Sequence, residues 1–406
     1  MVSEISSKKS YVYWSTPYEL SAIANSSKNM ITNNLVKTRL IMDILLDGFI
    51  TSGENVGIKV HVGEAYNTRY LRHDYVHEVV DAIKTKGGIP TLIETQGLGM
   101  ETHLVEIPDS CTLCLGSRKN AEDHYNIAHL HGYSESIIGA PLQFLDGEKG
   151  LDGKDVKING IHLKKVKVAS SLYQYDKLVV ISHFKGHPQA GFGGALKQLG
   201  IGCVTKQYKF KAHFNGALSI TKRCNISKCN QECVAACPVD AIRIENDSAV
   251  IDPSICIGCL GCPEACPIRK AIKSADYNDF KVFNEIFIDN ALAVVSSFGP
   301  QNIRYINFAF DIPAMCDCVV NANMPVIPDL GIFGSKDPVA IDKACVDMET
   351  AAPGLPILDA NDRWADPIPE GVEKFKALNK NLNPMWQLEA AIKNKLGNED
   401  YELIKI

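Results

Sequence analysis

The hydrophobic pattern of the first part of the chain alternates between helix-like and strand-like stretches. Apolar residues recur at helical spacing from Leu35 to Phe49 and again from Tyr70 to Lys86. Two short runs typical of buried strands accompany them, VGIKVHVGE at residues 56–64 and IPTLIE at residues 89–94. This alternation predicts an α/β fold, with a mostly parallel sheet flanked by helices.

The same pattern continues towards the C-terminus. KLVVISHF, at residues 177–184, is a continuous apolar run of the kind found in strands that are buried on both faces. A helical stretch near residues 289–297 and an apolar run at residues 303–312 follow later. Asp337 is placed to cap a further helix that begins at Pro338. These elements extend the predicted α/β domain.

A cysteine-rich stretch interrupts this pattern and contains an internal repeat. The sequence CPVDAIRI at residues 237–244 returns as CPIRKAIK at residues 266–273. We therefore predict a small α+β ferredoxin-like domain at residues 221–275. It is inserted into one discontinuous α/β domain that residues 1–220 and 276–406 form.

Composition and charge narrow the classes of function. The 406 residues are 46% hydrophobic and 22% charged, as in ordinary globular proteins, and the formal charge of −5 argues against nucleic-acid binding. No stretch approaches the ~18 apolar residues of a membrane span, and the first residues do not resemble a signal peptide, so we expect a cytoplasmic protein. Fourteen cysteines in a reducing compartment indicate metal ligands rather than disulfides.

The second of two cysteine runs has the spacing of a bacterial ferredoxin. Cys256, Cys259, Cys262 and Cys266, followed by Pro267, match C-x2-C-x2-C-x3-C-P. In such runs the first three thiolates bind one 4Fe-4S cluster, and the fourth binds the other cluster of the pair. Soft thiolate ligands suit iron-sulfur clusters.

The first run is a widened version of the second. It has two extra residues between its first and second cysteines and one between its second and third, but keeps all four thiols and the proline. We predict two 4Fe-4S clusters, with one cluster alone or a zinc site as alternatives. Zinc usually binds paired Cys-x2-Cys knuckles, which fits this pattern less well. The predicted ligand sets are Cys224, Cys229, Cys233 and Cys266 for one cluster, and Cys256, Cys259, Cys262 and Cys237 for the other.

Several long motifs carry a resemblance to a known family. They are IKVHVGEAYNTRYL (58–71), HLHGY (129–133), GAPLQFLDGEKG (139–150), SHFKGHPQAGFGGALKQLGIGC (182–203) and CDCVVNANMPVIPDLGIFGSKDPVAIDKA (316–344). From about residue 56 to residue 347 the chain resembles the uncharacterised iron-sulfur-centre proteins of anaerobes, domain of unknown function 362. The resemblance implies an α/β domain with a ferredoxin-type insertion and an oxidoreductase or electron-transfer role. It does not imply a substrate.

Two features depart from that family pattern. One is the widened first cysteine run, and the other is the pair Cys111 and Cys114, where the family leads us to expect a tyrosine. The pair is interpreted as two buried free thiols, with a metal site as the alternative.

A glycine-rich segment carries the predicted catalytic residues. GFGGALK, at residues 191–197, lacks the glycine spacing of nucleotide-binding loops. Its glycines either let backbone amides and a helix N-terminus approach an anion, or only permit tight packing. His183, Lys185, His187 and Lys197 surround this segment, and we predict that they orient and protonate a substrate.

Further candidates lie near other strand ends. Lys59 and His61 alternate along one strand and Glu64 follows it, so they either face a cleft at the carboxyl ends of the strands or are solvated. A second candidate group is made of three cysteines, which are interpreted as an extra metal site, a redox-active thiol pair or ordinary thiols. These cysteines are Cys203, Cys316 and Cys318.

Together these features predict an oxidoreductase. Electrons from a redox partner protein would pass through two 4Fe-4S clusters to a small substrate, with an anionic one favoured, held in the α/β cleft near residues 183–197. One alternative is a non-enzymatic, ferredoxin-like electron carrier that docks a partner. Another is an accessory protein that assembles a metal centre with Cys203, Cys316 and Cys318.

Overall fold

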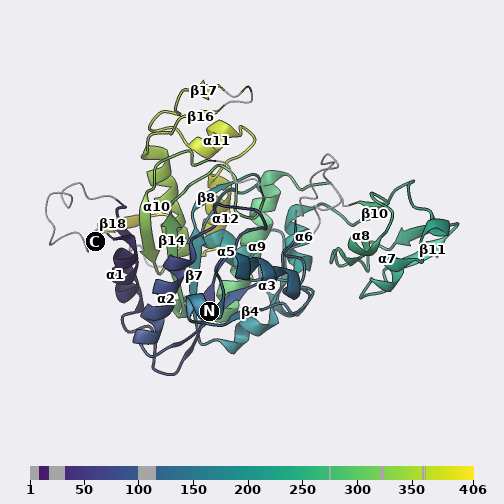
Figure 1. The fold of residues 1–406 in the computed structure, drawn as a ribbon, viewed down its shortest axis with the longest axis horizontal. Coiled ribbons are helices and arrows are strands. Elements are labelled where there is room, and N and C mark those ends of the chain that lie inside the picture. Colours follow the sequence, from purple (N-terminus) through teal and green to yellow (C-terminus); the bar gives the residue numbers. More distant parts are fainter. Residues whose placement is uncertain are drawn as a thin grey trace.

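The centre of the molecule is an eight-stranded sheet with helices on both faces (Figure 1). The structure is a computed structural model that describes residues 9–17, 33–98, 116–273, 276–320, 324–358, 361 and 363–406. Cys111 and Cys114 lie outside these described residues. Among the described helices, none has both the length and the apolar character needed to cross a membrane.

Most neighbouring strands of the large sheet are parallel. In spatial order the strands are β18 (Tyr401–Lys405), β1 (Ser10–Ser15), β15 (Gly331–Ser335), β14 (Ile303–Ala309), β7 (Lys177–His183), β2 (Asn55–Lys59), β3 (Ile89–Glu94) and β4 (Leu142–Phe144). The strands from β14 to β4 are parallel to one another, and β18 is parallel to β1. Only β15 is antiparallel to both of its neighbours in this sheet. The predicted α/β fold with a mostly parallel sheet is confirmed.

Two hydrophobic cores cover the two faces of this sheet. One core packs under α1 (Asn34–Leu46) and α2 (His73–Thr85) and includes Val179. The other packs under helices of the opposite face and includes Val180. Those helices are α5 (Ala195–Gly200), α9 (Phe280–Phe298), α10 (Pro338–Ala351) and α12 (Met385–Lys393). Consecutive side chains of β7 enter opposite cores, which explains why this strand is apolar throughout.

The predicted helices and strands are present in the structure, with several changes of boundary. Asp337 Oδ1 accepts hydrogen bonds from the backbone N–H of Val339 at 2.8 Å and of Ala340 at 3.0 Å, so it caps α10 as expected. The helix expected near residue 289 begins earlier, at Phe280, because Asp279 caps it there.

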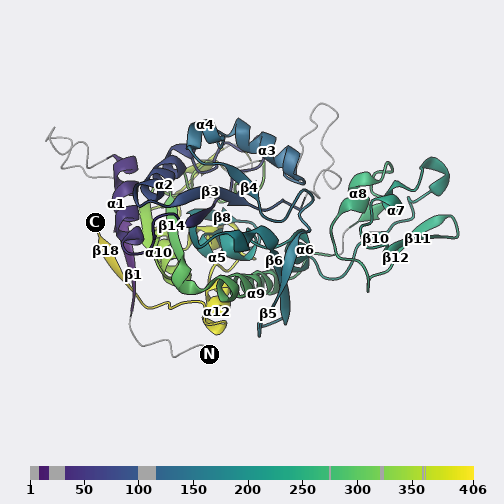
Figure 2. The ribbon, with the colours of Figure 1, turned by 90° about the horizontal axis from the view of Figure 1, so that it is seen from below.

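Residues 219–273, which we call the cysteine lobe, form a separate small unit. The lobe contains β10 (Ser219–Ile220), α7 (Glu232–Ala235), β11 (Ile242–Glu245), β12 (Ser248–Ile251), α8 (Gly261–Ala265) and β13 (Ile272–Lys273). β10 pairs with β13, so the chain enters and leaves the lobe along neighbouring strands. Figure 2 shows the lobe beyond α6 (Lys206–His213), away from the large sheet.

The remaining elements border the large sheet. The helices are α3 (Ala121–Leu130), α4 (Glu135–Ile138) and α11 (Lys374–Leu378), with short 3-10 turns at Ser170–Gln174 and Pro300–Asn302; a third such turn, Ile226–Lys228, belongs to the cysteine lobe. The strand pairs are β5 (Gly153–Lys157) with β6 (Lys165–Ala169), β8 (Lys185–His187) with β9 (Gly191–Gly193), and β16 (Ile357–Leu358) with β17 (Trp364–Ala365). The β8–β9 hairpin matters most here, because it carries two of the predicted site residues.

Candidate functional site

The first group of lobe thiols combines cysteines from both runs. Burial raises the pKa of the Cys233 thiol, and the neighbouring sulfurs of Cys266, Cys224 and Cys229 raise it further. The backbone N–H of Ala249 donates to Cys224 Sγ at 3.4 Å. Cys266 belongs to the second run, so this group has the interleaved membership that the spacing predicts.

The second group of lobe thiols contains the other four cysteines of the two runs. Burial raises the pKa of the Cys262 thiol, and Cys259, Cys256 and Cys237 raise it further. The backbone N–H of Ala241 donates to Cys237 Sγ at 3.2 Å. These four cysteines line a small cavity together with apolar side chains. Four thiols in an apolar setting with N–H donors fit the ligand set of an iron-sulfur cluster.

Helix α6 lies between the second thiol group and a larger cavity. The Phe210 side chain belongs to the core of the cysteine lobe. A Cβ on Gly258 would lie 2.3 Å from Phe210 Cδ1, so only glycine lets the loop of the second group approach this closely. Lys209 and His213, on the same helix, line the larger cavity. One helix therefore contacts both regions.

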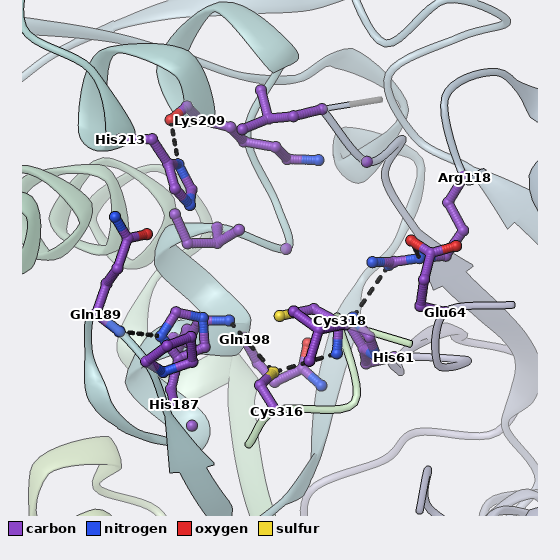
Figure 3. A pocket seen from close by; sticks show the side chains of 18 of the residues that line it. His61, Glu64, Arg118, His187, Gln189, Gln198, Lys209, His213, Cys316 and Cys318 are labelled. Carbon is purple, nitrogen blue, oxygen red and sulfur yellow. Dashed lines mark hydrogen bonds and ion pairs between the residues drawn. The ribbon is translucent and has the colours of Figure 1, made fainter. Parts of the chain in front are cut away.

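The larger cavity has a volume of about 460 Å³ and lies at the carboxyl ends of β2, β3, β7 and β14 (Figure 3). Ligand sites of open α/β sheets gather at these ends. Its wall is partly apolar, formed by Leu98, Ile201, Phe214 and Phe280. Its polar groups come from seven separate segments of the chain, so the tertiary fold assembles them.

Three of the four predicted catalytic residues line this cavity. Lys185 and His187 come from β8, and Lys197 comes from α5. His183 instead lies beneath the cavity, with Nε2 at 2.8 Å from Phe310 O. The structure therefore brings three of these side chains together and holds the fourth in a structural position.

Asp317 is a buried anion that organises the base of the cavity. Lys185 Nζ lies 2.7 Å from Asp317 Oδ1, and both side chains are almost fully buried. Burial alone would raise the pKa of the Asp317 carboxyl, but Lys185, His61 and His183 lower it well below its usual range. Asp317 in turn raises the pKa of Lys185 against the effect of burial. Both groups are charged and paired.

Cys316 and Cys318 flank this aspartate and face the cavity (Figure 3). The backbone N–H of Cys318 donates to Cys316 Sγ at 3.3 Å, and Lys197 Nζ lies 3.9 Å from the same sulfur. Burial would raise the pKa of the Cys316 thiol, but the Cys318 thiol, Lys197 and Lys185 lower it to about 6. The hydrogen bond with Cys316, and then burial, raise the pKa of Cys318. The pair thus favours a thiolate on Cys316.

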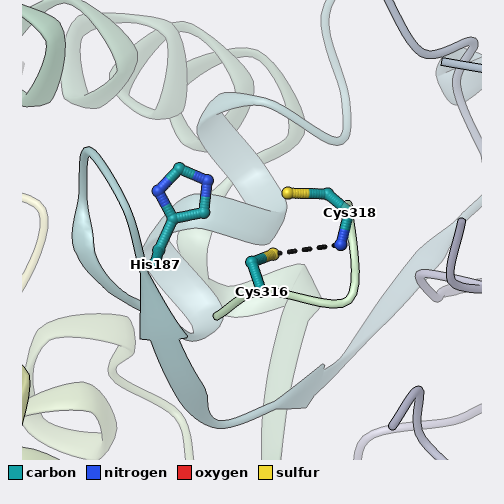
Figure 4. A group of neighbouring side chains, drawn as sticks. All are labelled: His187, Cys316 and Cys318. Atoms are coloured by element: carbon teal, nitrogen blue, oxygen red, sulfur yellow. Dashed lines mark hydrogen bonds between the residues drawn. The ribbon is translucent and has the colours of Figure 1, made fainter. Parts of the chain in front are cut away.

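His187, rather than Cys203, lies beside these two cysteines. One ligand atom from each of His187, Cys316 and Cys318 lies within 4.8 Å of the other two (Figure 4). Cys203 Sγ is buried elsewhere, at 3.7 Å from Gln198 O, and burial raises its pKa to about 12. The structure brings together two cysteines of the predicted group of three and places the third apart.

The glycine-rich segment binds an internal carboxylate. The backbone N–H groups of Ala195 and Leu196, at the start of α5, donate to Asp342 at 2.8 and 2.9 Å. A Cβ on Gly194 would lie 2.3 Å from Asp342 Oδ1. The first amides of α5 are therefore satisfied by Asp342. The idea that they approach an anionic ligand is wrong, and the tight-packing interpretation holds.

The end of β2 places two of its three candidates in the cavity wall. His61 and Glu64 line the cavity, and Arg118 bridges them, with 3.0 Å to His61 Nε2 and 3.2 Å to Glu64 Oε2. Lys59 points beneath the cavity and contacts Glu94 Oε1 at 2.7 Å. Burial lowers the pKa of His61 well below its usual value.

Sequence reasoning missed Arg118, Lys209, His213 and the role of Asp317. A signal existed for two of them, because Lys209 and His213 are four residues apart on a helix and share one face. Their basic character together with that spacing indicates a functional face. Nothing local in the sequence marks Arg118.

Known proteins of two kinds are similar to this chain. Residues 56–347 match the family described as domain of unknown function (DUF362). A ferredoxin of Alicyclobacillus acidocaldarius subsp. acidocaldarius is 45% identical over 50 residues, which are 12% of this chain and 63% of that protein. Ferredoxin 7Fe of Hydrogenibacillus schlegelii is 41% identical over 61 residues, 15% of this chain and 76% of its own length.

One solved structure is similar over much of the chain. It is the lactate racemase apoprotein from Thermoanaerobacterium thermosaccharolyticum, with 10% sequence identity and a TM-score of 0.37. The alignment covers 84% of this chain and 58% of that one. A likeness at this level is no evidence of a shared activity.

Proposed function

We propose that this chain, which belongs to the family described as domain of unknown function (DUF362), is an iron-sulfur oxidoreductase. In this proposal residues 221–275 form a ferredoxin-like domain, inserted between residues 1–220 and 276–406, that holds two 4Fe-4S clusters. The similarity to ferredoxins and the two groups of four thiols support it. The clusters would supply one-electron redox chemistry, and a redox partner protein would supply the electrons.

The position of α6 carries the proposal. On one side the helix packs Phe210 into the lobe core, where Gly258 of the second thiol group contacts it. On the other side Lys209 and His213 line the cavity. An α-helix with its side chains is about 10–12 Å across, so a cluster at the second group would lie about one helix width from the cavity. This short separation favours direct electron transfer to a molecule bound there.

The charges of the cavity favour a small anionic substrate. Lys185 is paired with Asp317, and Arg118 is paired with Glu64. Lys197 has the sulfur of Cys316 as its contact, at 3.9 Å, and no carboxylate within ion-pair distance in the described part of the chain. Its ammonium group is therefore available to hold an anion and to stabilise negative charge that develops on it. A flat docking surface for a carrier would not need these buried groups.

The first test counts the clusters. Anaerobic iron and sulfide analysis is expected to give about eight of each per chain, and EPR after dithionite reduction is expected to show two 4Fe-4S signals. About four iron atoms would refute the second cluster. Zinc without sulfide would refute the redox function.

The second test follows electrons to the cavity. The protein is reduced, and its reoxidation is timed with a small anionic oxidant and with a small cationic one. Lys197→Met is expected to slow the reaction with the anionic oxidant alone, because it removes the cavity cation that has no carboxylate partner among the described residues. Lys211→Met, a charge change on α6 whose ammonium lies over the Tyr208 ring, is the control. Equal rates in both variants would show that electrons leave the clusters without the cavity.

A further inference from the structure

We propose that Cys316 and Cys318 form a reversible dithiol–disulfide couple in the wall of the large cavity, with Cys316 as the attacking thiolate. The couple goes beyond the proposed function, because its chemistry needs two thiols and an oxidant but no cluster. Both cysteines line the cavity, and their sulfurs lie within 4.8 Å of each other. A small rotation about the side-chain bonds would bring them to bonding distance.

The surroundings of Cys316 favour its thiolate. The backbone N–H of Cys318 points at Cys316 Sγ from 3.3 Å, and the ammonium of Lys197 lies 3.9 Å away. Thiolates, not thiols, attack disulfides, and nearby lysines and N–H donors stabilise them. Cys318 lies one residue beyond the intervening aspartate, where it can resolve a mixed disulfide on Cys316.

The other charges around the pair leave one positive charge for the thiolate. Asp317 Oδ1 lies 3.3 Å from Cys316 Sγ, but the same oxygen is paired with Lys185 at 2.7 Å. His61 and His183 contact the second oxygen of this carboxylate at 3.7 and 3.4 Å. Arg118, on the far side of the cavity, is paired with Glu64. Lys197 is the cation that remains to balance a negative sulfur.

His187 completes a triad that resembles a zinc site, but its hydrogen bonds disfavour metal binding. A zinc-bound histidine donates its second ring N–H to an acceptor. Here the Nδ1 atom of His187 instead accepts from the backbone N–H of Ala190 at 2.9 Å and of Gln189 at 3.2 Å. The neutral ring therefore carries its proton on Nε2, and neither nitrogen offers a free lone pair. An N–H beside the two sulfurs suits a thiolate (Figure 4).

The reaction balances with a small disulfide as the co-reactant. The Cys316 thiolate attacks one sulfur of that disulfide, its S–S bond breaks, and one small thiolate leaves. Cys318 loses its proton and attacks the sulfur of Cys316, which releases the second small thiol and forms the Cys316–Cys318 bond. Two electrons from the two cysteines and the proton of Cys318 pass to the small disulfide. The reverse step needs two electrons, which the two clusters would supply singly if the proposed function holds, and one proton from solvent for the Cys318 thiol.

The test measures the oxidation state of Cys316 and Cys318 in one tryptic peptide. Trypsin cuts after Arg304 and Lys336, and the peptide between them contains Cys316 and Cys318 and no other cysteine. The intact protein is equilibrated anaerobically in buffers of reduced and oxidised dithiothreitol, its free thiols are alkylated in denaturant, and the digest is analysed by mass spectrometry. The expected result is a reversible change from two alkylated cysteines to an internal disulfide. The peptide with Cys345, a buried thiol of α10, is the internal control.

Two variants test the roles of Cys318 as the resolving thiol and of Lys197 as the cation that stabilises the Cys316 thiolate. After incubation with oxidised glutathione, Cys318→Ser is expected to form no internal disulfide and to accumulate a mixed disulfide of Cys316 with glutathione. Lys197→Met is expected to slow alkylation of Cys316 about tenfold at about pH 5, below the pKa of the thiol, where a rise of one unit in that pKa lowers the thiolate fraction about tenfold. Lys343→Met removes a lysine of α10 that is paired with Asp347, and it is expected to leave the rate unchanged.

The proposal fails if the folded protein keeps both thiols reduced in every buffer. It also fails if the isolated protein holds one zinc per chain that Cys316→Ser or His187→Ala removes. Iron and sulfide are measured on the same sample. A working couple without iron would defeat only the proposed iron-sulfur function, whereas eight iron atoms without a couple would defeat only this inference.

Discussion

The cysteine lobe and the large cavity both gather cysteine thiols, but they surround them differently. In the lobe, the charged neighbours that perturb Cys233 and Cys262 most are other cysteines, and they raise the pKa of both thiols. In the cavity, the neighbours of Cys316 include Lys197 and Lys185, and its pKa is lowered. Four clustered thiolates repel each other until positive iron joins them, whereas a single thiolate beside two lysines is stable alone. The same residue type therefore serves two chemistries.

The largest expected effect comes from breaking the interleaving of the two runs. Cys237→Ala removes the ligand that the first run contributes to the second group. We expect loss of about four of eight iron atoms, with the other cluster kept, because each 4Fe-4S cluster needs its own four thiolates. Cys203→Ala, which removes a buried thiol outside the lobe, is the control. Iron analysis with EPR decides, and complete retention of iron would contradict the ligand assignment.

The cavity is expected to be most sensitive at its buried ion pair. Asp317→Asn leaves the ammonium of Lys185 buried without its carboxylate. Removing one partner of a buried pair costs about 3–5 kcal/mol of unfolding free energy. Denaturant unfolding followed by near-UV circular dichroism measures the loss. The double variant with Lys185→Met is expected to recover much of it, and no recovery would show that the pair itself is not the cause.

A smaller effect is expected where the two regions touch. Gly258 has φ +66°, and a Cβ there would clash with Phe210 of α6. Gly48 has φ +62° with nothing within 4 Å, so Gly48→Ala measures the backbone cost alone, about 1–2 kcal/mol. Gly258→Ala is expected to cost about 1–3 kcal/mol more, because it overpacks the contact. Thermal unfolding measures the loss of stability in each variant. Equal losses in the two variants would show that Gly258 is not tightly packed against α6.

The smallest effect concerns the charge next to the second thiol group. Lys206, at the start of α6, interacts electrostatically with Cys259. Lys206→Met is expected to lower the reduction potential of that cluster by tens of millivolts, because a positive charge favours the reduced state. An EPR-monitored redox titration measures this shift, and Lys211→Met serves as the control. An equal shift in the reduction potentials of both clusters would indicate that Lys206 lies equally near to the two clusters.

Much of the fold was predictable, because its signals are local. The apolar runs of β7 and β14 and the cap at Asp337 depend on a few consecutive residues, and the structure agrees with them. The boundary of α9 was less predictable, since its first turns carry the polar residues Lys281, Asn284 and Glu285. In the lobe, the two sets of cluster ligands stay a prediction that rests on the spacing of the cysteines.

The sequence by itself determined the sheet and its covering helices, since periodicity acts over short stretches of chain, and the spacing of eight cysteines predicted two sets of cluster ligands. Only the tertiary structure decided the chemistry of the cavity. It placed His187 and Lys197 beside Cys316, moved Cys203 elsewhere, and gave the first amides of α5 to Asp342. These contacts join residues from separate strands and loops. Which side chains meet depends on strand order and on the direction of each side chain, and no single segment of the sequence determines either.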